Sequence, residues 1–158
     1  MYKPLLGAVG LIFVSACTTS APPTRAASDY EAADLACLQE AIYFEAGNSP
    51  DVGQQAVAYV ILNRVEDPRF PNTVCGVVQE GEDVGRCQFS YRCQLDPENI
   101  RWPENMRRAV QTATSILVGE IEDPTDGALF FHASWMPPGW FNTLKRVGNF
   151  GGNIFYRS

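Results

Sequence analysis

Apolar and polar positions alternate with the period of a helix over three stretches of this chain. In the first stretch, Asp34–Phe44 and the residues just after it, one helix face collects positions spaced by three, one and three: Leu38, Ala41, Ile42 and Glu45. A second helix is predicted over Pro50–Val65, and a third over Pro103–Val118. The core of the domain is therefore expected to be helical.

Shorter elements are predicted between and after these helices. Two prolines and a short apolar run predict a turn and then a brief helix around Val74–Gln79. Cys87–Cys93 alternates and is rich in β-forming and aromatic residues, which favours a strand or an extended loop. Strands are also predicted within Gly127–Trp135 and Asn153–Ser158. The fold class predicted is α+β, mainly helical, with a small β element.

Glu45 is the one charged residue in the apolar face of the first helix. Gly47 and Asn48 tolerate positive φ and are expected to end that helix, and Ser49 resembles the N-cap of the next one. Burial and the negative end of the helix dipole both disfavour a charged carboxylate, so the pKa of Glu45 should rise. A carboxylic acid that stays partly protonated near neutral pH suits general acid catalysis. The alternative is a capped or salt-bridged glutamate, with Arg64 as its partner.

The first residues have the pattern of an export signal. A basic start precedes the apolar run Leu5–Val14, which is too short for a normal membrane span. Ser15 and Ala16 before Cys17 resemble the lipobox of bacterial lipoproteins, in which cleavage precedes the cysteine and its sulfur carries a lipid. The alternative is an ordinary signal peptide, cleaved after Ala16 or within residues 21–27.

Three regions follow from this pattern. Residues 1–16 are predicted to be a lipoprotein signal peptide, and residues 17–30 a lipidated cysteine with a flexible tether, since Thr, Ser, Ala and Pro cannot bury enough apolar surface to fold. Residues 31–158 suit a single domain. Thr18 is not the aspartate that retains many lipoproteins in the inner membrane. An outer-membrane anchor facing the periplasm is therefore expected, with the inner membrane or secretion as alternatives.

The remaining cysteines are even in number: Cys37, Cys75, Cys87 and Cys93. In an exported chain this favours two disulfides, and spacing leaves three connectivities open. A zinc site is the competing interpretation, but no C-x-x-C pair is present, and we expect no metal.

The formal net charge is −6, which argues against a nucleic-acid partner. It also argues against broad electrostatic attraction to an anionic polymer. An anionic substrate must therefore be recognised locally, by a domain that we expect to be monomeric.

A set of motifs between Cys37 and Arg157 resembles the SleB/CwlJ cell wall hydrolase family. In order, they read "YFEA", "GQQAVAYVILNRV", "DPRFP", "CQFS", "GALFFHA" and "FYR". The resemblance implies a lysozyme-like, mainly helical fold that cleaves the glycan strands of peptidoglycan between N-acetylmuramic acid and N-acetylglucosamine, without a cofactor. The family's acid corresponds to Glu45.

The resemblance also implies binding residues. Gln88, Phe89 and Ser90 match the family's cleft-lining motif, and His132, the only histidine, matches its "FFHA" segment. The alternatives are a structural strand beside Cys87 and a structural histidine. Aromatic side chains that can stack on sugars are Tyr43, Trp135 and Trp140, although packing is the common role of such residues.

Two positions depart from the family pattern. The family continues its acid motif as Glu-Ala-Arg-Gly-Glu, whereas this chain has "EAGNS", and many members carry a histidine where this chain has Asn153. Ser49 therefore stands in place of a second glutamate. Its hydroxyl cannot act as an acid or base, but it can hold a water or a sugar.

A single motif carboxylate favours a lytic transglycosylase, because one glutamate can protonate the glycosidic oxygen and then accept the proton of the muramic acid 6-hydroxyl. Muramidase-type hydrolysis needs a second carboxylate, for which the candidates are Asp51, Asp96, Glu98 and Asp126. Two other functions stay open. One is a catalytically weakened glycan-binding lipoprotein, and the other a cysteine peptidase with His132 as base.

Overall fold

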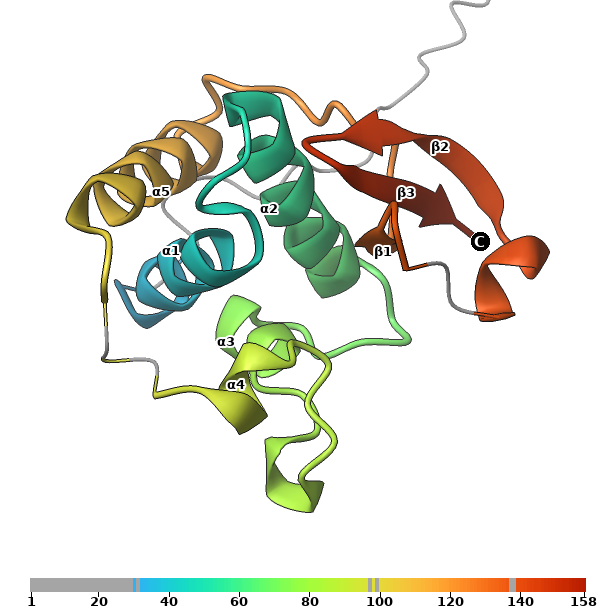
Figure 1. Cartoon of the computed structure of the whole chain (residues 1–158), viewed down its shortest axis with the longest axis horizontal. Coiled ribbons are helices and arrows are strands. Elements are labelled where there is room, and N and C mark those ends of the chain that lie inside the picture. The colour runs from blue at the N-terminus through green and yellow to red at the C-terminus, as the bar shows by residue number, and fades with distance from the viewer. Residues whose placement is uncertain (1–29, 31, 97, 99, 137–138) are drawn as a thin grey trace, which may run out of the picture.

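The computed structural model describes residues 30, 32–96, 98, 100–136 and 139–158 (Figure 1). The predicted signal peptide, Cys17 and all but Tyr30 of the tether lie outside the described residues. The helices are α1 (Ala32–Ala46), α2 (Asp51–Glu66), α3 (Val74–Val78), α4 (Tyr91–Gln94) and α5 (Pro103–Leu117), with single 3₁₀ turns η2 (Glu82–Val84) and η3 (Gly139–Thr143). The strands are β1 (Phe130–Ala133), β2 (Lys145–Phe150) and β3 (Asn153–Arg157). This confirms a mainly helical α+β fold with a small β element.

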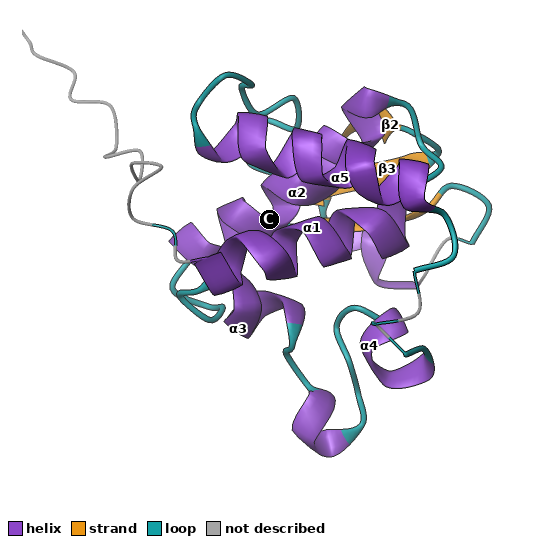
Figure 2. Ribbon diagram, turned by 90° about the vertical axis from the view of Figure 1, so that its left-hand side faces the viewer, coloured by secondary structure: helices purple, strands orange, loops and turns teal. Residues whose placement is uncertain are grey.

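Helix α1 is the centre of the helical layer and contacts α2, α3 and α5 (Figures 1 and 2). Its predicted face is confirmed, because Leu38, Ala41 and Ile42 are completely buried. Tyr43 and Ala46 are buried as well, so most of the helix circumference is covered. Small residues on the facing helices, including Ala58, Ala109 and Ala113, join the same core. Val110 of α5 is 37% exposed and points partly to solvent.

The three strands form one antiparallel sheet in the order β1-β3-β2, beside α2 (Figure 1). Phe155 of the central strand is fully buried and packs in a second core with Ala56, Val57 and Val60 of α2 and with Ala46 of α1. The end of α1 is therefore held between the helical layer and the sheet. Strand β2 was not predicted, because its sequence "KRVGNF" is mostly polar and lies on the sheet edge.

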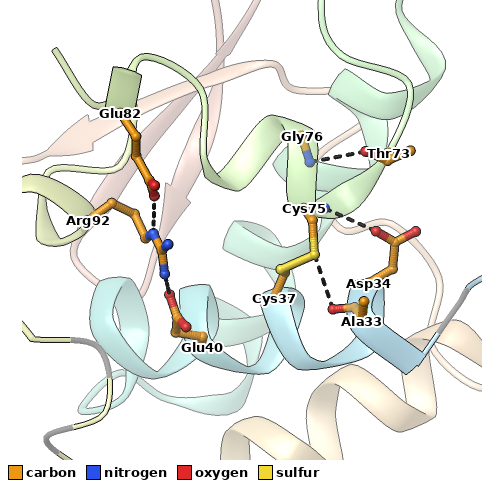
Figure 3. Close-up of a disulfide and its surroundings, with 9 residues drawn as sticks. All are labelled: Ala33, Asp34, Cys37, Glu40, Thr73, Cys75, Gly76, Glu82 and Arg92. Atoms are coloured by element: carbon orange, nitrogen blue, oxygen red, sulfur yellow. Dashed lines mark hydrogen bonds and ion pairs between the residues drawn. A yellow bond between two sulfur atoms is a disulfide. The ribbon is translucent and has the colours of Figure 1, made fainter. Parts of the chain in front are cut away.

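Two disulfides join the four described cysteines, as predicted. Cys37–Cys75 links α1 to α3, and Figure 3 shows the contacts that reinforce it: Asp34 accepts a hydrogen bond from the Cys75 backbone at 3.0 Å, and Thr73 caps α3 at Gly76. Cys87–Cys93 closes a short loop. No free thiol is left among these four residues, which removes the cysteine peptidase interpretation for the described chain.

Two local predictions were wrong. Cys87–Cys93 is not a strand: its second half enters α4, where Cys93 and Leu95 donate backbone hydrogen bonds to Ser90 and Tyr91. A six-residue separation closed by a disulfide favours such a tight turn over an extended segment. Helix α1 ends at Ala46, so Gly47 and Asn48 end it as predicted, but neither residue adopts positive φ. Gly47 is needed because a Cβ there would collide with the carbonyl oxygen of Tyr43.

No helix in the described part of the chain has the length and apolarity to cross a bilayer.

Candidate active site

Glu45 lies in the last turn of α1, where two cavities share it as a lining residue. The first, of about 490 Å³, is called here the helix-side cavity. It is lined by residues from the end of α1, the end of α4 and the start of α5: Tyr43, Phe44, Glu45, Ala46, Gly47, Asn48, Ser49, Gln94, Leu95, Asp96, Arg101, Trp102 and Asn105.

The second, of about 720 Å³, is called the sheet-side cavity. Its lining comes from α2, the segment before α4, β1 and the loop before β2, with one residue from β3: Glu45, Arg64, Gln88, Phe89, Ser90, Phe130, Phe131, His132, Ala133, Met136, Thr143, Leu144 and Asn153. Two binding regions flanking one carboxyl group suit a polymer that is cut between two of its units.

Burial raises the pKa of Glu45 from 4.5 to about 7. The predicted alternative, a salt bridge to Arg64, is not formed. Arg64 instead donates from Nε to the Leu129 carbonyl at 2.8 Å, and its guanidinium lies over the rings of Phe70 and Phe89. Glu45 therefore has the property that a general acid needs near neutral pH, namely a substantial protonated fraction.

The segment after Glu45, "GNS", is held in place by α5 and by the β2–β3 hairpin. Arg108 of α5 donates to the carbonyl of Ser49 at 2.8 Å and to the carboxylate of Asp51 at 2.7 Å. The prediction that Ser49 is the N-cap of α2 was wrong: the N-cap is Pro50, and the Ser49 hydroxyl instead donates to the Gly151 carbonyl at 3.2 Å. Ser49 thus lines the helix-side cavity while its hydroxyl ties this turn to the hairpin.

Tyr43 has a different role from the predicted sugar contact. Its side chain is 6% exposed, and its hydroxyl accepts backbone hydrogen bonds from Arg101 at 3.0 Å and Trp102 at 3.2 Å. The oxygen is therefore already engaged, and Tyr43 positions the backbone of the opposite cavity wall. Neither Arg101 nor Trp102 was found from the sequence, because no short motif marks them.

Gln88, Phe89 and Ser90 all line the sheet-side cavity, as expected of a cleft motif. Gln88 and Ser90 are exposed there, so their amide and hydroxyl groups are accessible to a ligand. Phe89 is 2% exposed and lies against the Arg64 guanidinium. It forms the floor of the cavity and does not present an open aromatic face.

His132 also lines the sheet-side cavity, but both ring nitrogens have partners. Nδ1 is 2.8 Å from the Ala133 carbonyl and Nε2 is 3.0 Å from the Tyr156 hydroxyl. A carbonyl only accepts, so Nδ1 carries a hydrogen, and Nε2 lies within hydrogen-bond distance of the Tyr156 hydroxyl. The geometry favours a structural histidine over a catalytic base. Asn153 lines the same cavity, in register with Ala133.

Of the four carboxylates considered as a second catalytic group, only Asp96 lines a cavity with Glu45. Its oxygen accepts from the Glu98 backbone at 3.0 Å. Asp51 pairs with Arg108, and Asp126 with Arg157. Among the described residues no group of three potential metal ligands is found.

The two other residues predicted to stack on sugars are Trp135 and Trp140. Trp135 is 79% exposed and lines neither cavity. The side chain of Trp140 lies outside the described residues.

Comparisons with known proteins identify the family of this chain. The family model for cell wall hydrolases matches residues 48–156. The chain is 34% identical over 134 residues to a spore cortex-lytic enzyme of Halalkalibacterium halodurans, a match covering 84% of this chain and 37% of that protein. A spore cortex-lytic enzyme of Bacillus subtilis is 32% identical over 124 residues, covering 77% and 37%. The chain thus spans less than half the length of these curated relatives.

Solved structures extend the similarity to the whole fold. The catalytic domain of the germination-specific lytic transglycosylase SleB from Bacillus anthracis matches with a TM-score of 0.65 and 31% identity, over 82% of this chain and 98% of that one. The catalytic domain of the Bacillus cereus SleB protein matches with a TM-score of 0.61 and 28% identity, over 87% and 100%. The chain belongs to the SleB/CwlJ-type cell wall hydrolase family.

Proposed function

We propose that this protein cleaves the β-1,4 bond between N-acetylmuramic acid and N-acetylglucosamine in peptidoglycan as a lytic transglycosylase, with Glu45 as its single general acid and base. The observation that carries the proposal is a glutamate whose burial raises its pKa to about 7, at the point shared by two cavities. The description of the Bacillus anthracis relative as a lytic transglycosylase supports the same reaction.

The reaction needs two proton transfers at one carboxyl group. Protonated Glu45 donates to the glycosidic oxygen as the bond to C1 of muramic acid breaks. The resulting carboxylate accepts the proton of the muramic acid 6-hydroxyl, whose oxygen bonds to C1 and closes a 1,6-anhydro ring. Glu45 ends the cycle protonated again, and no water is added. With a pKa of about 7, Glu45 can both donate a proton to the glycosidic oxygen and accept one from the 6-hydroxyl near neutral pH.

Digestion of purified sacculi followed by mass spectrometry tests the proposal. Wild-type protein should release muropeptides that end in 1,6-anhydromuramic acid, and Glu45→Gln should lower their yield by roughly 10²- to 10⁴-fold, because the acid is lost. Asp96→Asn is the matched control and should retain anhydro products. If wild type instead released muropeptides with reducing ends, and both Glu45→Gln and Asp96→Asn abolished them, the reaction would be hydrolysis. If wild type released no products, a glycan-binding protein would be favoured.

We propose further that the chain is exported by residues 1–16, lipidated at Cys17, and anchored in the outer membrane facing the periplasm, where a monomer reaches the glycan strands. The lipobox-like "VSAC" and the disulfides of an exported chain support this. In a Cys17→Ser variant, the protein should lose incorporated palmitate and leave the membrane fraction. Retention of both would contradict the anchor.

A further inference from the structure

Trp102 is a large apolar side chain that stays 56% exposed although it lines the helix-side cavity. Leu95, in the same lining, is 55% exposed. The large apolar residues of a small domain are mostly buried, and exposed ones grouped in a hollow are typical of a ligand surface. These two exposed apolar side chains thus lie within a cavity that contains Glu45.

The backbone that carries Trp102 is fixed relative to Glu45. Both Arg101 and Trp102 donate their backbone N–H groups to the hydroxyl of Tyr43, which is two residues before Glu45 on α1. Pro103 follows at the first position of α5 and restricts the chain on the other side. The backbone from which the indole projects therefore keeps a set position relative to α1 and Glu45.

We infer that Trp102 is the platform on which a pyranose ring of the glycan strand stacks in the helix-side cavity, next to the bond that Glu45 cleaves. This inference rests on the proposed function. The indole presents a flat apolar face, and one face of a pyranose consists of C–H groups that can cover it. Tyr43 is then a positioning residue, which acts on the sugar through the backbone of Trp102 and not by contact.

Arg101 gives the same cavity a local positive charge. It is the only cationic side chain in the described lining of the helix-side cavity, and its guanidinium has no hydrogen bond or ion pair with the described residues. The chain as a whole carries a formal charge of −6, which repels an anionic polymer. Arg101 therefore favours muramic acid units that carry an acidic peptide, whereas Trp102 stacks on any pyranose.

Binding of chitotetraose to the Glu45→Gln protein, measured by titration calorimetry, isolates stacking from both catalysis and the peptide. Trp102→Ala should weaken binding by about tenfold, with partial recovery in Trp102→Phe. Trp135→Ala is the matched control, since that exposed indole lines neither cavity, and should leave affinity unchanged. Arg101→Gln should weaken binding of peptide-bearing glycan fragments and leave chitotetraose unaffected. Equal affinity of Trp102→Ala and its parent would overturn the inference.

Steady-state kinetics on sacculi with catalytically intact protein separates this inference from the proposed function. Trp102→Ala should raise KM about tenfold with kcat changed less than about threefold, because stacking binds the sugar equally in the ground state and in the transition state. Tyr43→Phe should raise KM in the same direction, and adding it to Trp102→Ala should raise KM no further. Active wild type with an unchanged KM in Trp102→Ala refutes the platform alone. Inactive wild type with Trp102-dependent chitotetraose binding refutes the cleavage reaction alone.

Discussion

The two cavities that share Glu45 are built in different ways. The sheet-side cavity takes Gln88 and Ser90 from one short segment and His132 from another, and each segment is a recognisable motif. The helix-side cavity depends on hydrogen bonds between residues about sixty positions apart, such as Tyr43 with Arg101 and Ser49 with Arg108. One half of the site can therefore be read from the sequence, whereas the other half depends on how α5 packs on α1.

The two halves are also held by different forces. The Cys87–Cys93 disulfide closes the loop that contains Gln88 and Ser90, so a covalent bond restrains the sheet-side wall. The helix-side wall is held by hydrogen bonds of Tyr43, Asn105 and Arg108 and by the Arg108–Asp51 ion pair. Its geometry should therefore be the more sensitive to single substitutions.

Removing each disulfide by paired Cys→Ala changes tests the covalent restraint. Loss of Cys37–Cys75, with a sequence separation of 38, should lower the free energy of unfolding by about 4 kcal/mol, and loss of Cys87–Cys93, with a separation of 6, by about 2 kcal/mol. Denaturant unfolding measures both. At a temperature where both variants stay folded, activity should fall more in the Cys87–Cys93 variant, because its loop lines the cavity. The reverse ranking of activity would show that the wall does not need its disulfide.

Glu45, which belongs to both halves, should make stability depend on pH. Its pKa is about 7 in the folded protein and 4.5 when exposed. As pH rises through this window the unfolded chain loses the proton that the folded protein keeps, so the free energy of unfolding falls by up to about 3 kcal/mol above pH 7. Unfolding of wild type and Glu45→Gln from pH 4 to 8 measures this. The variant should become the more stable protein only as pH rises, and parallel curves would contradict the raised pKa.

The sequence predicts much of the fold and only part of the site. Helices α1, α2 and α5 follow from apolar periodicity, as does the position of Glu45, and α3, β1 and β3 follow from short apolar runs. Helix α4 was not predicted, because its segment reads as a strand or an extended loop. Strand β2 could not be predicted from the sequence, because a polar edge strand has no alternating buried face. The sequence also does not predict the place of Trp102 in the site or the hydrogen bonds of the Tyr43 and Ser49 hydroxyls, because these depend on backbone groups distant in the sequence.

The hydrogen-bonded wall can be weakened through Arg108. Arg108→Ala removes the donor to the Ser49 carbonyl and the ion pair with Asp51, and should cost about 1–2 kcal/mol of stability. The activity of folded Arg108→Ala should be several-fold below that of wild type, because the turn after Glu45 loses its contact with α5. The neighbouring Arg107, paired with Glu104 on the exposed face of α5, is the control and should change stability by less than about 0.5 kcal/mol. Equal activity of the two variants would show that the turn holds its position without α5.

The smallest effect is expected at Ser49, where the chain departs from its family. Ser49→Ala removes one hydrogen bond to Gly151, which should cost about 0.5–1 kcal/mol, and activity should stay within about threefold of wild type. Ser49→Glu restores a second carboxylate at the edge of the helix-side cavity. If the serine hydroxyl only ties the turn to the hairpin, neither change should replace anhydro products with reducing ends. A large loss of kcat in Ser49→Ala would instead mean that the hydroxyl contacts the reacting sugar, and the helix-side cavity would then contribute to the chemistry as well as to binding.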